Sequence, residues 1–81
     1  MTKDQKTYHD IMSGNHDRNI MFSDIKHLLL SMNFRCSIKG DHFIFRKDDT
    51  PIINLQPDNG KAKGYQVRQI RKIFREKELE V

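Results

Sequence analysis

Residues 34–45 read FRCSIKGDHFIF and contain two short segments in which apolar and polar side chains alternate. Every second residue from 34 to 38 is apolar, and the same spacing returns at Phe43 and Phe45. A period of two is typical of a strand with one buried face. The Gly40-Asp41 pair between the segments suits a two-residue turn. The stretch therefore predicts an antiparallel hairpin with strands over 34–39 and 42–46.

A third strand is expected over 52–56, between the turn residues 48–51 and 57–60. The alternation then gives a three-stranded antiparallel sheet with two different faces. The apolar face, which should pack on helices, consists of Phe34, Cys36, Ile38, Phe43, Phe45, Ile53 and Leu55. The polar and cationic face consists of Lys39, His42, Ile44, Arg46, Asn54 and Gln56. This second face can be left open to solvent.

Three segments with apolar residues at helical spacing flank the sheet. The first covers residues 3–13, where Thr2 and Gln5 have the spacing of a capping box. The second covers 23–32, with Ser23 as its expected cap. The third, over 64–79, is amphipathic and basic. The order helix, helix, three-stranded meander, helix predicts an α+β domain.

The length and composition of the chain predict one small domain. The 81 residues are 36% hydrophobic and 32% charged, which suits a folded domain of modest stability. We expect a single domain over 1–81, with an N-terminal helix and linker over 1–17 and a core over 18–79. The lone cysteine excludes an intrachain disulfide, and neither a membrane span nor a signal peptide is evident. The sequence therefore predicts a soluble, cytoplasmic protein.

The net charge of +4 arises entirely from the last part of the chain. Residues 1–33 and 34–60 each carry four basic and four acidic side chains, whereas residues 61–81 carry seven basic and three acidic ones. A one-sided basic segment favours phosphate backbones as partners. The alternative is a solvated helix face that only keeps a small protein soluble.

Within this basic segment, Lys61, Lys63 and Arg68 are the best candidates for binding RNA. They lie near the start of the last helix, where backbone N–H groups also favour phosphate. Arg75, farther along, is assigned to the solvated face. Tyr65 can stack on a base or pack on the sheet, and we expect packing.

His42 is the one histidine on the predicted sheet, and it lies on the polar face. Gly40 leaves the backbone open to close approach by a ligand, and Lys39 and Arg46 supply positive charge for a phosphate. An imidazole can remove the proton of a ribose 2′-OH, after which the oxygen attacks the adjacent phosphorus without any metal. The alternative is an ordinary histidine at a strand edge. The other histidines and Cys36 lack the close spacings of a zinc site.

Four segments in this order resemble the HicA-type toxins, the small ribonucleases of bacterial HicA–HicB toxin–antitoxin pairs. They are NIMFSDIKHLLLSMNF (19–34), IKGDHFIF (38–45), IINLQP (52–57) and KAKGYQVRQIRKI (61–73). The resemblance runs from about Lys6 to Leu79. It implies a fold like the double-stranded-RNA-binding domain, α-β-β-β-α, with an extra N-terminal helix. It also implies mRNA cleavage without metal or cofactor, and a HicB-type antitoxin that covers the histidine.

By this resemblance His42 matches the family's catalytic histidine and Gly40 its glycine. The expected substrate-binding residues are Lys39, Gly40, Arg46, Gln56, Lys61, Lys63 and Arg68. Asp41 stands where the family most often has serine, and Phe43 where it often has a second histidine. A carboxylate at position 41 would repel a scissile phosphate. It motivates one alternative with the same fold, a non-catalytic RNA-binding module. A second alternative is a protein-interaction domain whose open sheet face docks only a partner chain.

Overall fold

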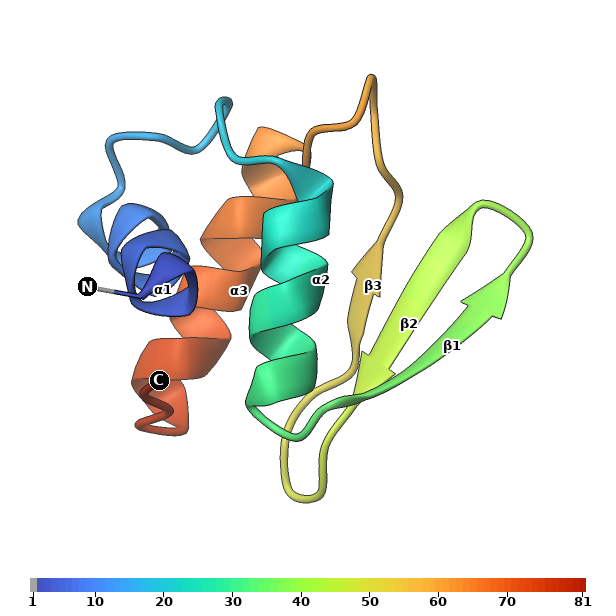
Figure 1. The fold of residues 1–81 in the computed structure, drawn as a ribbon. Helices are drawn as coiled ribbons and strands as arrows, with labels where there is room; N and C mark the ends of the chain where they lie inside the picture. The colour runs from blue at the N-terminus through green and yellow to red at the C-terminus, as the bar shows by residue number, and fades with distance from the viewer. Residues whose placement is uncertain (1) are drawn as a thin grey trace.

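The computed structural model describes residues 2–81, which form three helices and a three-stranded antiparallel sheet (Figure 1). The elements in chain order are α1 Lys3–Ser13, α2 Phe22–Ser31, β1 Arg35–Lys39, β2 His42–Arg46, β3 Ile53–Leu55 and α3 Gly64–Glu76. The helices lie together on one side of the sheet, and α1 is farthest from the β1–β2 hairpin (Figure 1). The predicted α+β class and element order are confirmed. In residues 2–81, no helix is long and apolar enough to cross a membrane.

The β1–β2 hairpin has the register that the alternation predicts. Lys39 pairs with His42 across the turn, and β3 then pairs with β2, giving the strand order β1-β2-β3. Gly40 has a φ of 61°, whereas Asp41 keeps a negative φ. A positive φ at the first central residue is what a type II′ turn requires, and glycine adopts it with least strain.

A single hydrophobic core joins the helices to the sheet. Its fully buried residues come from every helix and from β2 and β3: Ile11, Ile25, Leu28, Leu29, Phe45, Ile53, Leu55, Val67 and Ile70. Each side chain of this size contributes about 1.5–3 kcal/mol when it leaves water. The first helix belongs to this core, because the ring of Tyr8 stacks on Phe74 with centroids 5.5 Å apart. The N-terminal segment therefore braces the core.

The start of α2 differs from its prediction. The helix begins at Phe22, and its N-cap is Met21, without a capping side chain, so Ser23 lies inside the helix. The chain is held at this point by a distant loop, because the Phe22 N–H donates to the Gly60 carbonyl oxygen at 2.9 Å. Backbone contacts with that loop fix where the helix starts, and a serine cap is not needed.

The sheet also differs from its prediction in three respects. β1 begins at Arg35 rather than at residue 34. β3 covers only Ile53–Leu55 rather than 52–56, because β2 pairs with it only at Phe43–Phe45. Ile38 was expected in the core but is 62% exposed. Ile38 pairs with Phe43, but it lies on β1, the outer strand of the sheet, which is farthest from the helices (Figure 1). The helix layer therefore covers Phe43, whose ring lies 4.6 Å from that of Phe22, and leaves Ile38 exposed.

The last helix is shorter than expected. It ends at Glu76 instead of residue 79. Glu78 takes a left-handed φ of 52°, and the Leu79 N–H donates back to the Phe74 carbonyl oxygen at 2.9 Å. This reversal folds the C-terminal residues back onto the core.

Candidate functional site

His42 begins β2 on the polar face of the sheet, and its side chain is exposed. The neighbouring strand β3 places Asn54 beside it, with His42 Nδ1 at 3.1 Å from Asn54 Oδ1. An amide oxygen only accepts hydrogen bonds, so Nδ1 donates in this contact and carries a proton. In the neutral imidazole, Nε2 then keeps its lone pair and can accept a proton from a ligand.

His42 lines a pocket of about 250 Å³ between the sheet and the first turns of α3. We call this the His42 pocket; its residues are His42, Asn54, Gln56, Tyr65, Gln66 and Gln69. Apart from the imidazole, its polar side chains are three glutamines, an asparagine and a phenol, all uncharged at neutral pH. Tyr65 is 57% exposed, so the expectation that it packs on the sheet is wrong.

A group of cations lies at the start of α3, around Gly64. A second pocket there, of about 390 Å³, is lined by Arg18, Asp58, Asn59, Lys61, Ala62, Lys63 and Gly64. Arg68 joins the group, because a Cβ on Gly64 would lie 3.5 Å from Arg68 Nη1 and 3.6 Å from Arg18 Cγ. We define the basic cluster as Arg18, Lys61, Lys63 and Arg68. No acidic residue lies in the first turn of α3, and Asp58 is the one acidic side chain among the residues that line this pocket.

The His42 pocket and the basic cluster are neighbours. Gly64 lines the pocket of the basic cluster, and the next residue, Tyr65, lines the His42 pocket. The unpaired N–H groups of a helix's first turn add to the attraction of nearby cations for phosphate. The basic cluster therefore lies beside the accessible imidazole of His42, with the first turn of α3 between them.

The structure brings only some of the predicted site residues to His42. Lys39 lies directly opposite in the sheet, and Gln56 shares the pocket. Arg46 is four residues along β2, about 13 Å away at the rise of a strand. There it donates a hydrogen bond to Ser37 Oγ at 3.2 Å. Gly40 is open to ligands, since a Cβ at this position would meet nothing within 4 Å.

Two members of the site were not selected from the sequence. Asn54 was placed on the correct face by the alternation of β3, but its contact with His42 depends on strand register. Arg18 lies in a part of the chain with balanced charge, so no excess of basic residues draws attention to it. It reaches the basic cluster because the loop after α1 passes beside Gly64.

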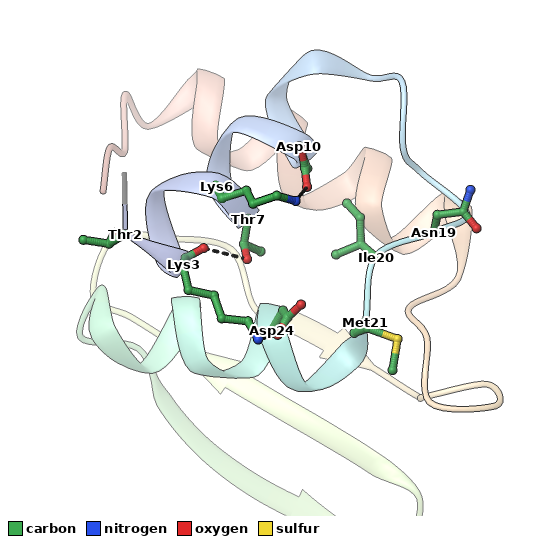
Figure 2. Close-up of a pocket in the computed structure, with 9 residues that line it drawn as sticks. All are labelled: Thr2, Lys3, Lys6, Thr7, Asp10, Asn19, Ile20, Met21 and Asp24. Carbon is green, nitrogen blue, oxygen red and sulfur yellow. Dashed lines mark hydrogen bonds and ion pairs between the residues drawn. The ribbon is translucent and has the colours of Figure 1, made fainter.

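Another pocket, of about 440 Å³, lies between α1 and the start of α2 (Figure 2). Its charged side chains pair with one another: Lys3 Nζ lies 3.2 Å from Asp24 Oδ1, and Lys6 Nζ lies 3.1 Å from Asp10 Oδ2. The Thr7 hydroxyl donates to the Lys3 carbonyl oxygen at 3.0 Å. None of its residues lines the His42 pocket, and its polar groups already have partners, so it is a weaker candidate site.

Within residues 2–81, no group of three or more His, Cys, Asp or Glu side chains is arranged to hold a metal ion. Cys36 is free and half-buried. No family model, curated protein or solved structure matches the chain. Its function is therefore inferred from its residues and their geometry.

Proposed function

We propose that this protein is a HicA-type toxin, an endoribonuclease that cleaves mRNA without a metal. The observation that carries the proposal is the position of His42, held by Asn54, next to the basic cluster. The four motif segments in their order add support from the sequence. The run from α2 to α3 also has the α-β-β-β-α order of a double-stranded-RNA-binding domain, which we propose as its fold.

In this proposal His42 acts first as a base and then as an acid. Nε2 takes the proton of the ribose 2′-OH, and the freed oxygen attacks the adjacent phosphorus. The bond to the 5′-oxygen breaks, and this oxygen leaves with a proton, so the products are a 2′,3′-cyclic phosphate and a 5′-hydroxyl. Proton transfer by a positioned side chain contributes roughly 10²–10⁴-fold to such a rate.

The surrounding cations bind the backbone and offset the charge that develops on the phosphate oxygens. Lys39, across the hairpin from His42, is the nearest by register. The basic cluster holds the phosphates that precede or follow the scissile one. Fixed positive charge near a reacting phosphate stabilises the transition state more than the ground state.

The test is to incubate the purified protein with mRNA in the presence of EDTA. We expect the wild type to cleave and His42→Ala to leave the RNA intact. His9→Ala is the matched control, because His9 is also exposed but lies on α1, away from the site. RNA binding without cleavage would contradict the ribonuclease and leave an RNA-binding module. A lack of salt-dependent RNA affinity would leave only a protein-interaction domain.

We further propose that a HicB-type antitoxin is the protein partner and that it covers His42. The exposure of His42 on the polar face makes such an occlusion possible. An antitoxin bound there should protect the imidazole from chemical modification by diethyl pyrocarbonate. Unchanged modification of His42 in the complex would contradict this mode of inhibition.

A further inference from the structure

We propose that the His42 pocket holds one nucleobase of a single-stranded RNA, so that cleavage occurs next to a preferred base. The inference rests on the proposed ribonuclease function and adds a substrate class to it. Three independent features of the pocket carry it: its size and lack of charge, a buried amide that opens into it, and an exposed aromatic ring at its rim.

The size and chemistry of the pocket suit one uncharged planar group. Its volume of about 250 Å³ is below the roughly 300–1,000 Å³ of sites for drug-sized ligands. Its polar groups other than the imidazole are uncharged amides and a phenol, whereas the cations lie outside it in Lys39 and the basic cluster. A phosphate is attracted to those cations, and the base attached to the same nucleotide fits the neutral pocket.

Gln66 supplies a fixed hydrogen-bond donor. Its side chain is only 2% exposed, and its Oε1 accepts the Lys63 N–H at 3.2 Å. Gln66 also lines the His42 pocket. With Oε1 engaged by the Lys63 N–H, the amide NH₂ is the group that Gln66 offers to a ligand there. A donor that is held in this way matches a carbonyl oxygen or a ring nitrogen at the edge of a base.

Tyr65 supplies a stacking surface. It is among the large side chains that remain well exposed, and it lies in the first turn of α3. Gln69 follows four residues later, so both side chains project from the same face of the helix. Unstacked bases of single-stranded RNA are commonly held by an aromatic ring on one side and by amides along the edge. Tyr65 and Gln69 are in position for these two roles, with Gln56 on the opposite wall.

The first experiment measures binding without cleavage. In a His42→Ala background, the dissociation constant of a short single-stranded RNA is measured by fluorescence anisotropy. Adding Tyr65→Ala should raise it about tenfold or more, because stacking on an aromatic ring contributes about that much per base. Tyr65→Phe keeps the ring and should bind as the parent does. Arg75→Ala, at the far end of α3, is the control that should also leave the dissociation constant unchanged.

The second experiment maps cleavage sites with the His42 wild type in EDTA. We expect a preferred base beside the cut, and we expect Tyr65→Ala and Gln69→Ala to weaken that preference. Both side chains are exposed, so the variants should fold, which circular dichroism checks. Cleavage with no base preference, or an unchanged dissociation constant in Tyr65→Ala, would overturn the base pocket and leave the ribonuclease. Tyr65-dependent binding without any cleavage would overturn the ribonuclease and leave the base pocket.

Discussion

At the scale of single residues, Asn54 decides which nitrogen of His42 is available for chemistry. The contact of 3.1 Å between Nδ1 and the amide oxygen holds the proton on Nδ1. Nε2 of the neutral imidazole is thereby left as the hydrogen-bond acceptor. A histidine without such a partner would sample both tautomers and several ring orientations, so fewer encounters with substrate would be productive.

We therefore expect Asn54→Ala to alter the His42 tautomer and to slow cleavage. Without Asn54 the His42 ring is less well oriented, so part of its effect as a general base should be lost and kcat should fall about tenfold. The ¹⁵N chemical shifts of the His42 ring report the tautomer directly and do not depend on any activity. Asn54→Asp keeps an oxygen acceptor, so it should preserve the Nδ1–H form. Identical ring shifts in wild type and Asn54→Ala would contradict a positioning role.

Asp41 is a second residue at which one change is informative. It is exposed in the hairpin turn, next in sequence to His42. A carboxylate a few ångströms from a phosphate costs on the order of 1 kcal/mol in water, so Asp41→Ser should improve kcat/KM about fivefold at low salt. The gain should shrink as salt rises. Asp48→Ser, in the other turn, is the control, and an unchanged rate for Asp41→Ser at low salt would contradict the idea.

At the scale of elements, Arg71 shows how α3 holds the N-terminal part of the chain. Arg71 Nη1 and Nη2 lie 2.9 and 3.2 Å from the two carboxylate oxygens of Asp17. Nη1 also donates to the Ile11 carbonyl oxygen at 3.0 Å. The hydrogen bond with Asp17 raises the pKa of Arg71 above its ordinary value, and burial opposes this in part. One basic residue of α3 is thus a structural link rather than part of a solvated face.

Arg71→Ala should lower the free energy of unfolding by about 3 kcal/mol, because it leaves Asp17 largely buried without its partner. Both side chains are 15% exposed. The loss in the free energy of unfolding should therefore be at the lower end of the range for buried ion pairs that lose one partner. Urea denaturation measures it. Lys72→Ala breaks the exposed pair with Glu76 and should cost less than about 0.5 kcal/mol. Equal losses for the two variants would contradict a structural role specific to Arg71.

The C-terminal segment is held on α1 by Tyr8, whose hydroxyl donates to the Leu79 carbonyl oxygen at 2.8 Å. Burial, with a smaller contribution from Glu80, raises the pKa of Tyr8 above its ordinary 10.0. The contribution of the Tyr8 hydroxyl to folding stability is therefore complete at a pH below the pKa that Tyr8 has in the unfolded chain. It is lost as the pH rises through the higher pKa of the folded state, because the unfolded chain loses the proton first. Tyr8→Phe lacks this loss, so its stability deficit relative to wild type should narrow above pH 10. A deficit independent of pH in urea denaturation would contradict this.

The hairpin was predictable because its register follows from two alternating segments and one glycine turn. The capping box of α1 was predictable for the same reason, as Thr2 and Gln5 interact within one turn. The start of α2 was not, because a backbone contact with a distant loop decides it. The length of β3 was not, because it depends on how far β2 pairs with it, which is over Phe43–Phe45 only. Local rules fix an element's interior, whereas its ends depend on contacts that the sequence does not display.

At the scale of the whole molecule, the site is assembled from four parts of the chain. β2 contributes His42, β3 contributes Asn54, the start of α3 contributes Tyr65, and the loop after α1 contributes Arg18. Alternation alone placed the first two on one face. The position of α3 beside the edge strand, and the path of the loop around Gly64, require the packed core. The candidate base pocket and the full basic cluster were therefore beyond reach of sequence patterns.

This arrangement predicts how RNA affinity depends on salt. Each phosphate neutralised on a single strand contributes about −0.7 to the slope of log K against log salt. Removing Lys61 and Lys63 together should therefore make the slope shallower by about 1.4. Anisotropy titrations at several salt concentrations, in the His42→Ala background, measure it.

Lys72→Ala with Lys77→Ala removes the same charge from exposed positions outside the basic cluster. This control therefore separates local phosphate contacts from the effect of net charge. If both double variants reduced the slope equally, the protein would attract RNA only through its overall charge. A shallower salt slope seen only for the Lys61 and Lys63 double variant would instead place the RNA backbone at the start of α3. There it would lie next to the His42 pocket.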